Sequence, residues 1–509
     1  MSRSPVGGDI TRMGRGSGLN LGGAVCNQVA LFVIISLLAG TGQREVGRYA
    51  SCFALLSLLG LMCLAGFRAG LTRFVAMHVA DADPQRLRGT LRIGLGLTLA
   101  SSLVIGSALA VLAPVVASRL NDPDLTSGIR LVALALPAVT MSDAALAATQ
   151  GWRTQRPFTL IGRVFEPLAR LGLTAAAVGL GLGLVGAMWA LVIGAWAAAG
   201  LSLLAVHRRL RSTPRVSAVY EVRQLLSFST VSWASALAAT GLIWVDTLLL
   251  GALRDQDTVG SYNVATRLVT LAVFVMPPIN AAFSPHMAHL HHTGQQDAAA
   301  SAYGSASRWI LSLSMPAFIL LVVYPRELLS YFGPGFAQAA AVTVILAFGQ
   351  LINAAAGPCG TVLNMSGRVR LNMVDNVSVL LLNIGLNLAL IPRYGMVGAA
   401  ISWSASLVTV NVVKVLQARF VVGIRARQAR LGRVVLASLP AAGTAVLMTT
   451  WVHGWVSVVG LAAPVVALAY VVVLWALGLA AEDKALLASL LRGREVRSRS
   501  ARPTQQVLP

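Results

Sequence analysis

The sequence predicts an all-α integral membrane protein with about fourteen transmembrane helices, built as two pseudo-symmetric six-helix lobes (parallel repeats) plus two C-terminal helices. Three observations lead to this prediction. The chain is 56% hydrophobic and only 11% charged, whereas soluble domains contain about 25% charged residues. Apolar runs that are long enough to cross a bilayer follow one another with short connections. Short motifs also recur at an offset of 213 residues.

The N-terminal lobe is predicted at residues 19–206, after a cytoplasmic tail at 1–18. Windows of about 20 apolar residues give its six spans as 19–40, 49–75, 93–113, 127–150, 160–182 and 184–206. The first apolar run is longer than the core of a signal peptide and has no clear small-residue cleavage site, so we interpret it as a span. The Arg-rich segment 207–224 then links the two lobes on the cytoplasmic side.

The C-terminal lobe is predicted at residues 225–418, with spans 225–250, 261–286, 309–331, 338–363, 371–391 and 396–417. Its second span contains Pro277 and Pro278. Because proline lacks an amide donor, a break in this span is expected. Residues 419–483 hold two further spans, 433–452 and 456–480, and residues 484–509 form a basic cytoplasmic tail.

The formal net charge of +22 is unevenly distributed between the two sides of the membrane. If the spans alternate in direction, 31 of the 40 lysines and arginines fall on the side of the N-terminus. Cytoplasmic loops carry such an excess, so we predict that both termini are cytoplasmic, in a bacterial cytoplasmic (inner) membrane. Topology and attraction to anionic lipid account for the charge, and no nucleic-acid partner is predicted.

An internal repeat pairs the two lobes. The segment Val46-Gly47-Arg48-Tyr49-Ala50 reappears as Val259-Gly260-Ser261-Tyr262-Asn263, and Gly183-Leu184-Val185-Gly186-Ala187 reappears as Gly395-Met396-Val397-Gly398-Ala399. Offsets of 213 and 212 residues match spans one to six with spans seven to twelve. Because six is an even number, the halves have the same orientation and are related by an axis along the membrane normal. A cleft between the halves is therefore expected.

Three stretches resemble a known family: GLTRFVAMHVADAD at 70–83, the run 259–292, and NMSGRVRLNMVDNVSVLLLNIGLNLALIPRYGMVGAAISWS at 364–404. Together with the spans and the repeat, they resemble the multidrug/oligosaccharidyl-lipid/polysaccharide (MOP) exporter superfamily, in its polysaccharide-transport (Wzx-like) branch. The resemblance implies a flippase that carries an isoprenoid-pyrophosphate-linked glycan from the cytoplasmic to the outer leaflet. Two lobes would rock around a polar central cavity, as in lipid II flippases and drug/cation antiporters.

Three arginines within spans are the candidate substrate contacts. An anionic pyrophosphate that crosses hydrocarbon needs guanidinium donors, and an ionisable residue at depth costs about 2.5–3.5 kcal/mol unless it faces a cavity or a partner. Arg68 and Arg170 fall toward the cytoplasmic side, and Arg267 falls nearer the outer side. We predict that these arginines bind phosphate; a structural role is the alternative.

Carboxylates at matching depths are candidates for ion pairs or for coupling to an ion. Asp143 lies at the depth of Arg68, and Glu166 precedes Arg170 by four residues, a spacing that places both on one helix face. Asp375 occupies roughly the repeat position of Glu166. These residues are predicted to pair with cations or to respond to protons.

A second pair is predicted near the outer mouth, where Asp246 and Arg267 have similar depths. This pair is either a static salt bridge between adjacent helices or a pair that responds to substrate or protons. Asn280, Asn376 and Asn383 are predicted to line a glycan path. The alternative for these amides is hydrogen bonding between helices, which is common in membranes.

No enzyme activity, cofactor or metal is predicted. The chain has no G-x-x-x-x-G-K-[ST] motif, and its loops are too short for a glycosyltransferase or polymerase site. The histidines at 286, 289, 291 and 292 have no cysteine or carboxylate at ligand spacing, so we interpret them as interfacial loop residues.

The leading hypothesis is a flippase for a polyisoprenoid-pyrophosphate-linked oligosaccharide that works by alternating access. Its predicted partners are the lipid-linked glycan, membrane lipid and other membrane proteins of polysaccharide assembly. The alternative is a MATE-like cation-coupled multidrug antiporter, which Asp246 and Asp375 keep open because a cation carrier prefers carboxylates. A non-transporting scaffold for glycan assembly is a third hypothesis, but it leaves the polar residues at membrane depth unexplained.

Overall fold

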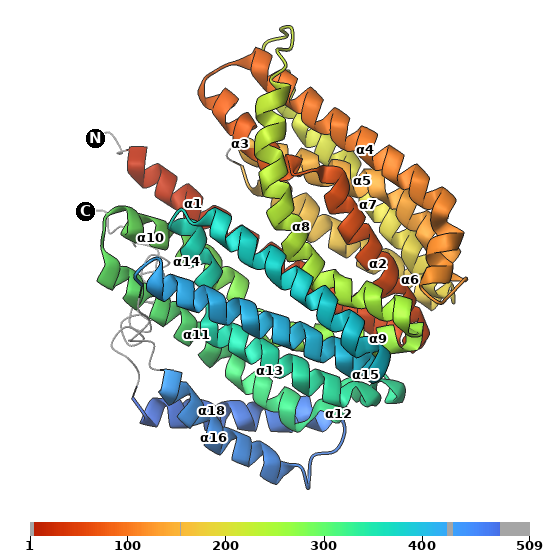
Figure 1. Cartoon of the computed structure of the whole chain (residues 1–509), viewed down its shortest axis with the longest axis vertical. Helices are drawn as coiled ribbons and strands as arrows, with labels where there is room; N and C mark the ends of the chain where they lie inside the picture. The colour runs from red at the N-terminus through yellow and green to blue at the C-terminus, as the bar shows by residue number, and fades with distance from the viewer. Residues whose placement is uncertain (1–4, 153, 425–430, 479–509) are drawn as a thin grey trace, which may run out of the picture.

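The computed structural model describes residues 5–152, 154–424 and 431–478 (Figure 1), and the predicted tail at 484–509 lies outside this part. Within it the chain forms helices and no β-strand, because a helix satisfies its own backbone hydrogen bonds in lipid. The elements are α1 (Pro5–Ala39), α2 (Gln43–Leu64), α3 (Phe67–Ala80), α4 (Pro84–Arg119), α5 (Leu125–Gly151), η1 (Phe158–Phe165), α6 (Glu166–Gly179), α7 (Gly183–Arg211), α8 (Val222–Leu253), α9 (Gln256–Ala272), α10 (Met276–His292), α11 (Gln296–Val323), α12 (Pro325–Ser330), η2 (Pro334–Ala339), α13 (Ala340–Ala356), α14 (Cys359–Met365), α15 (Val369–Phe420), α16 (Leu431–Met448), α17 (Trp455–Ser457), η3 (Val458–Ala462) and α18 (Ala463–Ala476).

The protein is a multi-pass membrane protein. Among the described helices, 11 are long and apolar enough to cross a membrane, or up to 12 if the bent pair α9–α10 is one span. The predicted spans 371–391 and 396–417 both lie in α15, and the span 160–182 corresponds to η1 and α6. Helix α1 begins at Pro5, so most of the predicted tail is helical. The number fourteen stays a prediction.

The chain changes direction at two places, between α9 and α10 and within α15, and the local sequence explains each change. Helices α9 and α10 are bent by 49°, and Pro277 and Pro278 stand in the first turn of α10, where a missing amide proton breaks no helical bond. The predicted break is confirmed. Helix α15 folds back on itself at Gly395, whose φ of 55° and ψ of −131° suit only glycine. Gln417 Nε2 donates to Asp375 Oδ1 at 2.8 Å across this reversal.

The helices form two groups that share α8. In Figure 1, α3, α4, α5 and α7 lie together, and α9, α11, α13 and α15 lie together. Helix α8 packs on α3, where a Cβ atom on Gly66 would lie 1.8 Å from the Ser229 carbonyl oxygen. Further along, α8 packs on α15, where a Cβ on Gly241 would lie 3.0 Å from Leu380 Cδ2. The division into lobes at 19–206 and 225–418 stays a prediction.

The repeated motifs of the two halves lie against each other where α2 crosses α9. A Cβ atom on Gly47 would lie 1.8 Å from the carbonyl oxygen of Gln256, and a Cβ on Gly260 would lie 2.0 Å from the carbonyl oxygen of Gln43. Gln43 and Gln256 are themselves 213 residues apart, so each half presents the same glutamine to the glycine of the other. Only glycine allows backbones to approach this closely. This crossing is called the glycine seam below.

Side chains reinforce the glycine seam in a similarly reciprocal way. Gln43 Nε2 donates to Ser261 Oγ at 2.8 Å, and Ser51 Oγ donates to Gln256 Oε1 at 2.9 Å. The seam lies at the end of the molecule where α2 begins, called the Gly47 end. The opposite end, where α3 ends, is called the Ala80 end.

The last helices pack on the second half. Helices α16 and α18 contact each other and α11, and they lie at the edge of the molecule in Figure 1. Tyr324 Oη, which follows α11, donates to the carbonyl oxygen of Ala445 in α16 at 2.5 Å. The predicted spans 433–452 and 456–480 correspond to α16 and to η3–α18.

Candidate functional site

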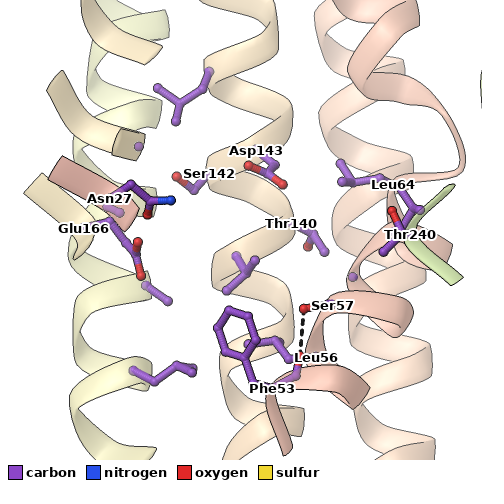
Figure 2. A pocket seen from close by; sticks show the side chains of 18 of the residues that line it. Asn27, Phe53, Leu56, Ser57, Leu64, Thr140, Ser142, Asp143, Glu166 and Thr240 are labelled. Atoms are coloured by element: carbon purple, nitrogen blue, oxygen red, sulfur yellow. Dashed lines mark hydrogen bonds between the residues drawn. The ribbon is translucent and has the colours of Figure 1, made fainter. Parts of the chain in front are cut away.

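A cavity of about 430 Å³ lies among α1, α2, α3, α5, η1, α6, α7 and α8. Most of its wall comes from the first half of the chain, and α8 closes it on the side of the second half. Figure 2 shows Asn27 and Glu166 close together on one side and Thr240 of α8 on the other. The polar residues that line the cavity are Asn27, Ser57, Arg68, Thr140, Ser142, Asp143, Glu166, Arg170 and Thr240.

Four of the ionisable residues selected from the sequence meet in this cavity: Arg68, Asp143, Glu166 and Arg170. Arg170 is 4% exposed, and its Nη1 atom lies 3.6 Å from Glu166 Oε1. Its guanidinium carbon lies 5.3 Å from the ring centre of Phe53. The predicted pairing of Glu166 with Arg170 therefore occurs, and it holds an arginine at the cavity wall.

Arg68 and Asp143 differ from the Glu166–Arg170 pair. Neither of them has an oppositely charged partner at bonding distance within the described residues. Asp143 and Arg68 line the same cavity. The Arg68 guanidinium is exposed and lies 5.8 Å from the ring centre of Phe158. Arg68 is thus a cation that is available to a ligand in the cavity.

Arg267 lies behind the cavity wall. Its guanidinium carbon lies 5.2 Å from the ring centre of Trp244, and Trp244 lines the cavity. The Nε atom of Arg267 is enclosed and makes no hydrogen bond to any described residue. Arg267 is therefore not among the residues that line the described cavity, and it contacts the lining residue Trp244.

The predicted pair of Asp246 with Arg267 is wrong. Asp246 is 1% exposed, and it accepts hydrogen bonds from Asn387 Nδ2 at 2.5 Å and from Tyr262 Oη at 3.2 Å. Tyr262 precedes Arg267 by five residues on α9, which displaces the arginine by about 7.5 Å along the helix axis. The neutral donors therefore satisfy the carboxylate, and the Trp244 face holds the guanidinium.

The amides predicted to line a glycan path lie outside the described cavity. Asn383 is 0% exposed, and its Oδ1 atom accepts from Asn387 Nδ2 at 3.1 Å. Asn376 Oδ1 accepts from Lys414 Nζ at 2.7 Å, a contact that joins the two arms of α15. Asn280 is partly buried on α10, and its Oδ1 atom has no partner among the described residues. For Asn376 the alternative of bonding between helices holds in this conformation, whereas the Asn383 side chain accepts within its own helix.

Asp375 pairs with no arginine in the described structure, although it was selected as the repeat counterpart of Glu166. Its Oδ1 atom accepts from Gln417, and its Oδ2 atom has no hydrogen-bond partner there. Within the described residues, no group of three or more His, Cys, Asp or Glu residues is placed to hold a metal ion. The four histidines of α10 are exposed at its last turns.

Aromatic residues of the site were not predicted from the sequence. Phe53 and Trp244 line the cavity and carry the guanidinium groups of Arg170 and Arg267. An aromatic residue within an apolar span gives no signal of its own, since lipid-facing and cavity-facing rings look alike in sequence. Lys414 is a further buried cation that was not predicted as a site residue; it is 9% exposed. Its position inside the span 396–417 was the available signal.

An ionic cluster fixes the first half at the Gly47 end. Asp122 is 1% exposed and accepts from Arg48 Nε at 2.6 Å and Arg48 Nη2 at 2.9 Å. Arg44 Nη2 donates to the same carboxylate at 3.2 Å. Burial opposes ionisation of Asp122, but the hydrogen bonds from Arg48 and Arg44 outweigh it and hold the pKa of the Asp122 carboxyl below its ordinary value. The cluster joins α2 to the turn between α4 and α5.

Two curated relatives match part of the chain. The "Probable low-salt glycan biosynthesis flippase Agl15" of Haloferax volcanii is 25% identical over 222 residues, 43% of this chain and 47% of that protein. The "Probable flippase AglR" of the same organism is 26% identical over 199 residues, 38% of this chain and 41% of that protein. The chain therefore spans less than half the length of the curated relatives it matches.

Solved transporters share the fold. An inward-facing MATE family multidrug transporter of the MOP superfamily has a TM-score of 0.67 at 12% identity, covering 80% of this chain and 98% of its own. The lipid II flippase MurJ has a TM-score of 0.66 at 12% identity, covering 88% of this chain and 98% of its own. At this identity the likeness shows the fold alone.

Family models match both halves. The MatE model matches residues 234–389. The model described as "Polysaccharide biosynthesis protein" matches residues 13–291, which is more than half of the chain. Taken with the helical architecture and the internal repeat, this match shows that the chain belongs to the polysaccharide biosynthesis protein family, within the MOP exporter superfamily.

Proposed function

We propose that the protein is a flippase that moves a polyisoprenoid-pyrophosphate-linked oligosaccharide from the inner to the outer leaflet by alternating access. The observation that carries this proposal is the cavity that Arg68 and Arg170 line together with amide and hydroxyl side chains. Guanidinium groups hold phosphate oxygens by charge-assisted hydrogen bonds, and the amides and hydroxyls can bond to sugar hydroxyls. The name of Agl15, a probable glycan biosynthesis flippase, agrees with a glycan substrate, and the name of AglR, a probable flippase, agrees with flipping.

The proposed orientation places the Ala80 end in the cytoplasm, with both termini there, in a bacterial cytoplasmic membrane. The support is the excess of arginine in the loops of that end. The glycine seam and the Asp122 cluster then lie at the outer side. Other membrane proteins of polysaccharide assembly are the proposed protein partners, and transport without catalysis is the proposed activity.

Alternating access requires that the two halves separate at one end while they approach at the other. The proposed moving units are residues 19–206 and 225–418, with 207–224 as their link and 419–483 as an appendage. The glycine seam is the contact that must open to release the glycan outward. The side-chain hydrogen bonds across it join neutral glutamine and serine side chains, so their separation leaves no buried charge unpaired.

A cation-coupled multidrug antiporter is the second candidate. The observation that favours it is the presence of Asp143 and Glu166 in the same cavity, since a cationic drug needs a carboxylate partner. The match of the MatE model to residues 234–389 agrees with this candidate. Glu166 is already paired with Arg170, which leaves Asp143 as the carboxylate available to a cation.

The test is a flipping assay in vesicles that contain only this protein. Polyprenyl-pyrophosphate sugars of defined structure are followed by leaflet-specific labelling, and a cationic dye is followed in parallel vesicles under a proton or sodium gradient. Movement of the lipid-linked sugar is the expected result. Dye extrusion without sugar movement would instead establish the antiporter.

A further inference from the structure

Two arginines share one aromatic ring at the edge of the cavity. The guanidinium carbon of Arg163 lies 5.1 Å from the ring centre of Phe158, and that of Arg68 lies 5.8 Å from the same centre. Arg68 lines the cavity, and so does Gly162, the residue before Arg163. Arg163 does not itself line the cavity, but its ring contact and its neighbour Gly162 place it beside the cavity.

Neither guanidinium has a counter-charge at bonding distance. Within the described residues, no carboxylate oxygen lies within 4.0 Å of Arg68 or Arg163. Glu166, the acid closest to Arg163 in the chain, pairs with Arg170, and Asp143 lines the same cavity as Arg68 without an ion pair to it among the described residues. Two neighbouring like charges raise the free energy of the protein unless an anion joins them. The arrangement is therefore that of a site whose anion comes from outside.

The local backbone explains why the two residues meet. The segment η1 is a π-helix, a rare wide turn that is frequent at functional sites. Its i to i+5 pattern places Phe158 and Arg163, five residues apart, on the same side. Helix α1 packs tightly on this turn at Gly23, where a Cβ atom would lie 2.5 Å from Thr159 Cγ2 and 3.1 Å from Arg163 Cβ. The close approach of α1 thus fixes the position of Arg163.

We propose that Arg163 and Arg68, which share the Phe158 ring, bind the diphosphate group of the substrate at the edge of the cavity before it reaches Arg170. This inference rests on the proposed function and deepens it by adding Arg163 as a specificity residue. A diphosphate can present one phosphoryl group to each guanidinium, whereas a monophosphate or a carboxylate has fewer oxygens and less charge to divide between the two. Cation–π contacts with Phe158 hold the two guanidinium groups in place while the site is empty.

The site is tested by binding to the full-length protein in nanodiscs, with polyprenyl diphosphate and polyprenyl monophosphate as probes. Arg163→Gln is expected to weaken diphosphate binding about tenfold or more, as expected for a charge-assisted hydrogen bond, and to weaken monophosphate binding less. Arg163→Lys keeps the charge without the planar fork and is expected to be intermediate. The matched control is Arg156→Gln, because Arg156 is an exposed arginine that does not line the cavity; its binding should match the wild type.

Equal losses for the two lipids, no loss in Arg163→Gln, or the same loss in Arg156→Gln would each overturn the proposal. Inorganic pyrophosphate separates the two sources of the diphosphate group. If it binds the wild type and loses affinity in Arg163→Gln, the site recognises diphosphate as such. If only the lipid form binds with this dependence, the site recognises the membrane-bound headgroup; either result supports the proposal.

Melting curves of each variant show whether it is folded. If Arg163→Gln does not fold, Phe158→Leu keeps both arginines and removes the ring between them, and it should reduce the preference for diphosphate over monophosphate; an unchanged preference would overturn the proposal. The inference and the function fail separately. Arg163-dependent diphosphate binding without any flipping by the wild type removes the flippase function and leaves the site, whereas flipping that is indifferent to Arg163 removes the site alone.

Discussion

Arg68 and Arg170 both line the cavity, but their surroundings give them different tasks. Arg170 is buried, paired with Glu166 and covered by Phe53, so its guanidinium already interacts with groups of the protein. Arg68 is exposed and has no ion pair in the described structure. Arg68 is therefore expected to contribute more binding free energy to an anionic ligand than Arg170. Loss of Arg170 would also leave Glu166 without its partner.

Replacement of Arg68 tests its role without a large structural cost. Arg68→Ala is expected to reduce flipping of the lipid-linked sugar about tenfold or more, since a charge-assisted hydrogen bond contributes about 1.5–3 kcal/mol. Membrane insertion should be unchanged because the side chain is exposed. The control is Arg73→Ala, whose guanidinium lies 4.4 Å from the Phe228 ring centre and outside the cavity lining. Flipping at the wild-type rate in Arg68→Ala would contradict the proposed phosphate contact.

Asp246 separates a structural role from a coupling role. Asp246→Asn can still accept from Asn387, so its melting temperature should stay near the wild type. Asp246→Leu leaves the buried Tyr262 hydroxyl without its acceptor and removes the bond from Asn387 to α8, which costs about 1–3 kcal/mol. Thermal melting in detergent measures both. Loss of transport in Asp246→Asn at an unchanged melting temperature would instead show that the carboxylate charge takes part in transport.

At the scale of helices, the glycine seam decides how closely α2 and α9 approach. A single methyl group at residue 47 or 260 cannot fit, because its carbon would overlap a carbonyl oxygen of the other helix. Gly47→Ala and Gly260→Ala are therefore expected to separate the helices at this end and to shift the protein toward the state that is open there. The rate at which a membrane-impermeant reagent labels a reporter cysteine introduced near the seam should then be higher than in the protein without the glycine substitution.

The matched control for the seam is Gly96→Ala in α4, since a Cβ atom at Gly96 meets no atom within 4 Å. This variant should label like the wild type and should be slightly more stable, because alanine is a better helix former than glycine. Unchanged labelling in both seam variants would contradict the role of the seam as a closed gate.

The turn between α4 and α5 depends on the charge of Asp122. Because the hydrogen bonds of Arg48 and Arg44 lower the pKa of the Asp122 carboxyl, its contribution to stability is fully present above the ordinary value of about 3.9. It is lost as pH falls through the lowered value. The cluster should therefore keep its contribution between about pH 5 and pH 8.

Two variants measure this contribution. Asp122→Asn is expected to lower the melting temperature at pH 7, because it removes the negative charge and one of the two acceptor oxygens that Arg48 and Arg44 use at this buried site, which costs about 1–3 kcal/mol. Asp124→Asn is the control, since the Asp124 side chain is 71% exposed and an exposed pair contributes about 0–1 kcal/mol. Equal melting temperatures for Asp122→Asn and the wild type would show that the cluster does not hold the turn.

At the scale of the whole molecule, α8 belongs to both groups of helices. It closes the cavity with Thr240 and Trp244, and it packs on α3 near Ser229. Its Asp246 accepts a hydrogen bond from Asn387 of α15. A helix shared in this way couples the cavity to the second half, because a shift of the second half moves the cavity wall. Arg267 of the second half contacts Trp244, so this ring joins the cavity wall to α9.

The sequence by itself determined the features that depend on local composition and spacing. Apolar length and the need to satisfy backbone bonds in lipid fix membrane helices; two prolines fix a break after residue 272; a spacing of four fixes the Glu166–Arg170 pair. The repeat also supplied the two glycines that meet in the seam. Each of these follows from neighbours along the chain or from a motif that can be compared directly.

Only the tertiary structure decided which distant residues meet. Depth along a span does not specify rotation about the helix axis. The depth of Asp246 therefore suggested Arg267 as its partner, whereas its hydrogen-bond donors are Tyr262 and Asn387. The same lack of rotational information hid the aromatic residues that carry the arginines. It also put the described cavity largely within the first half, with α8 as its far wall, because helix packing, and not the repeat, sets where a polar space remains.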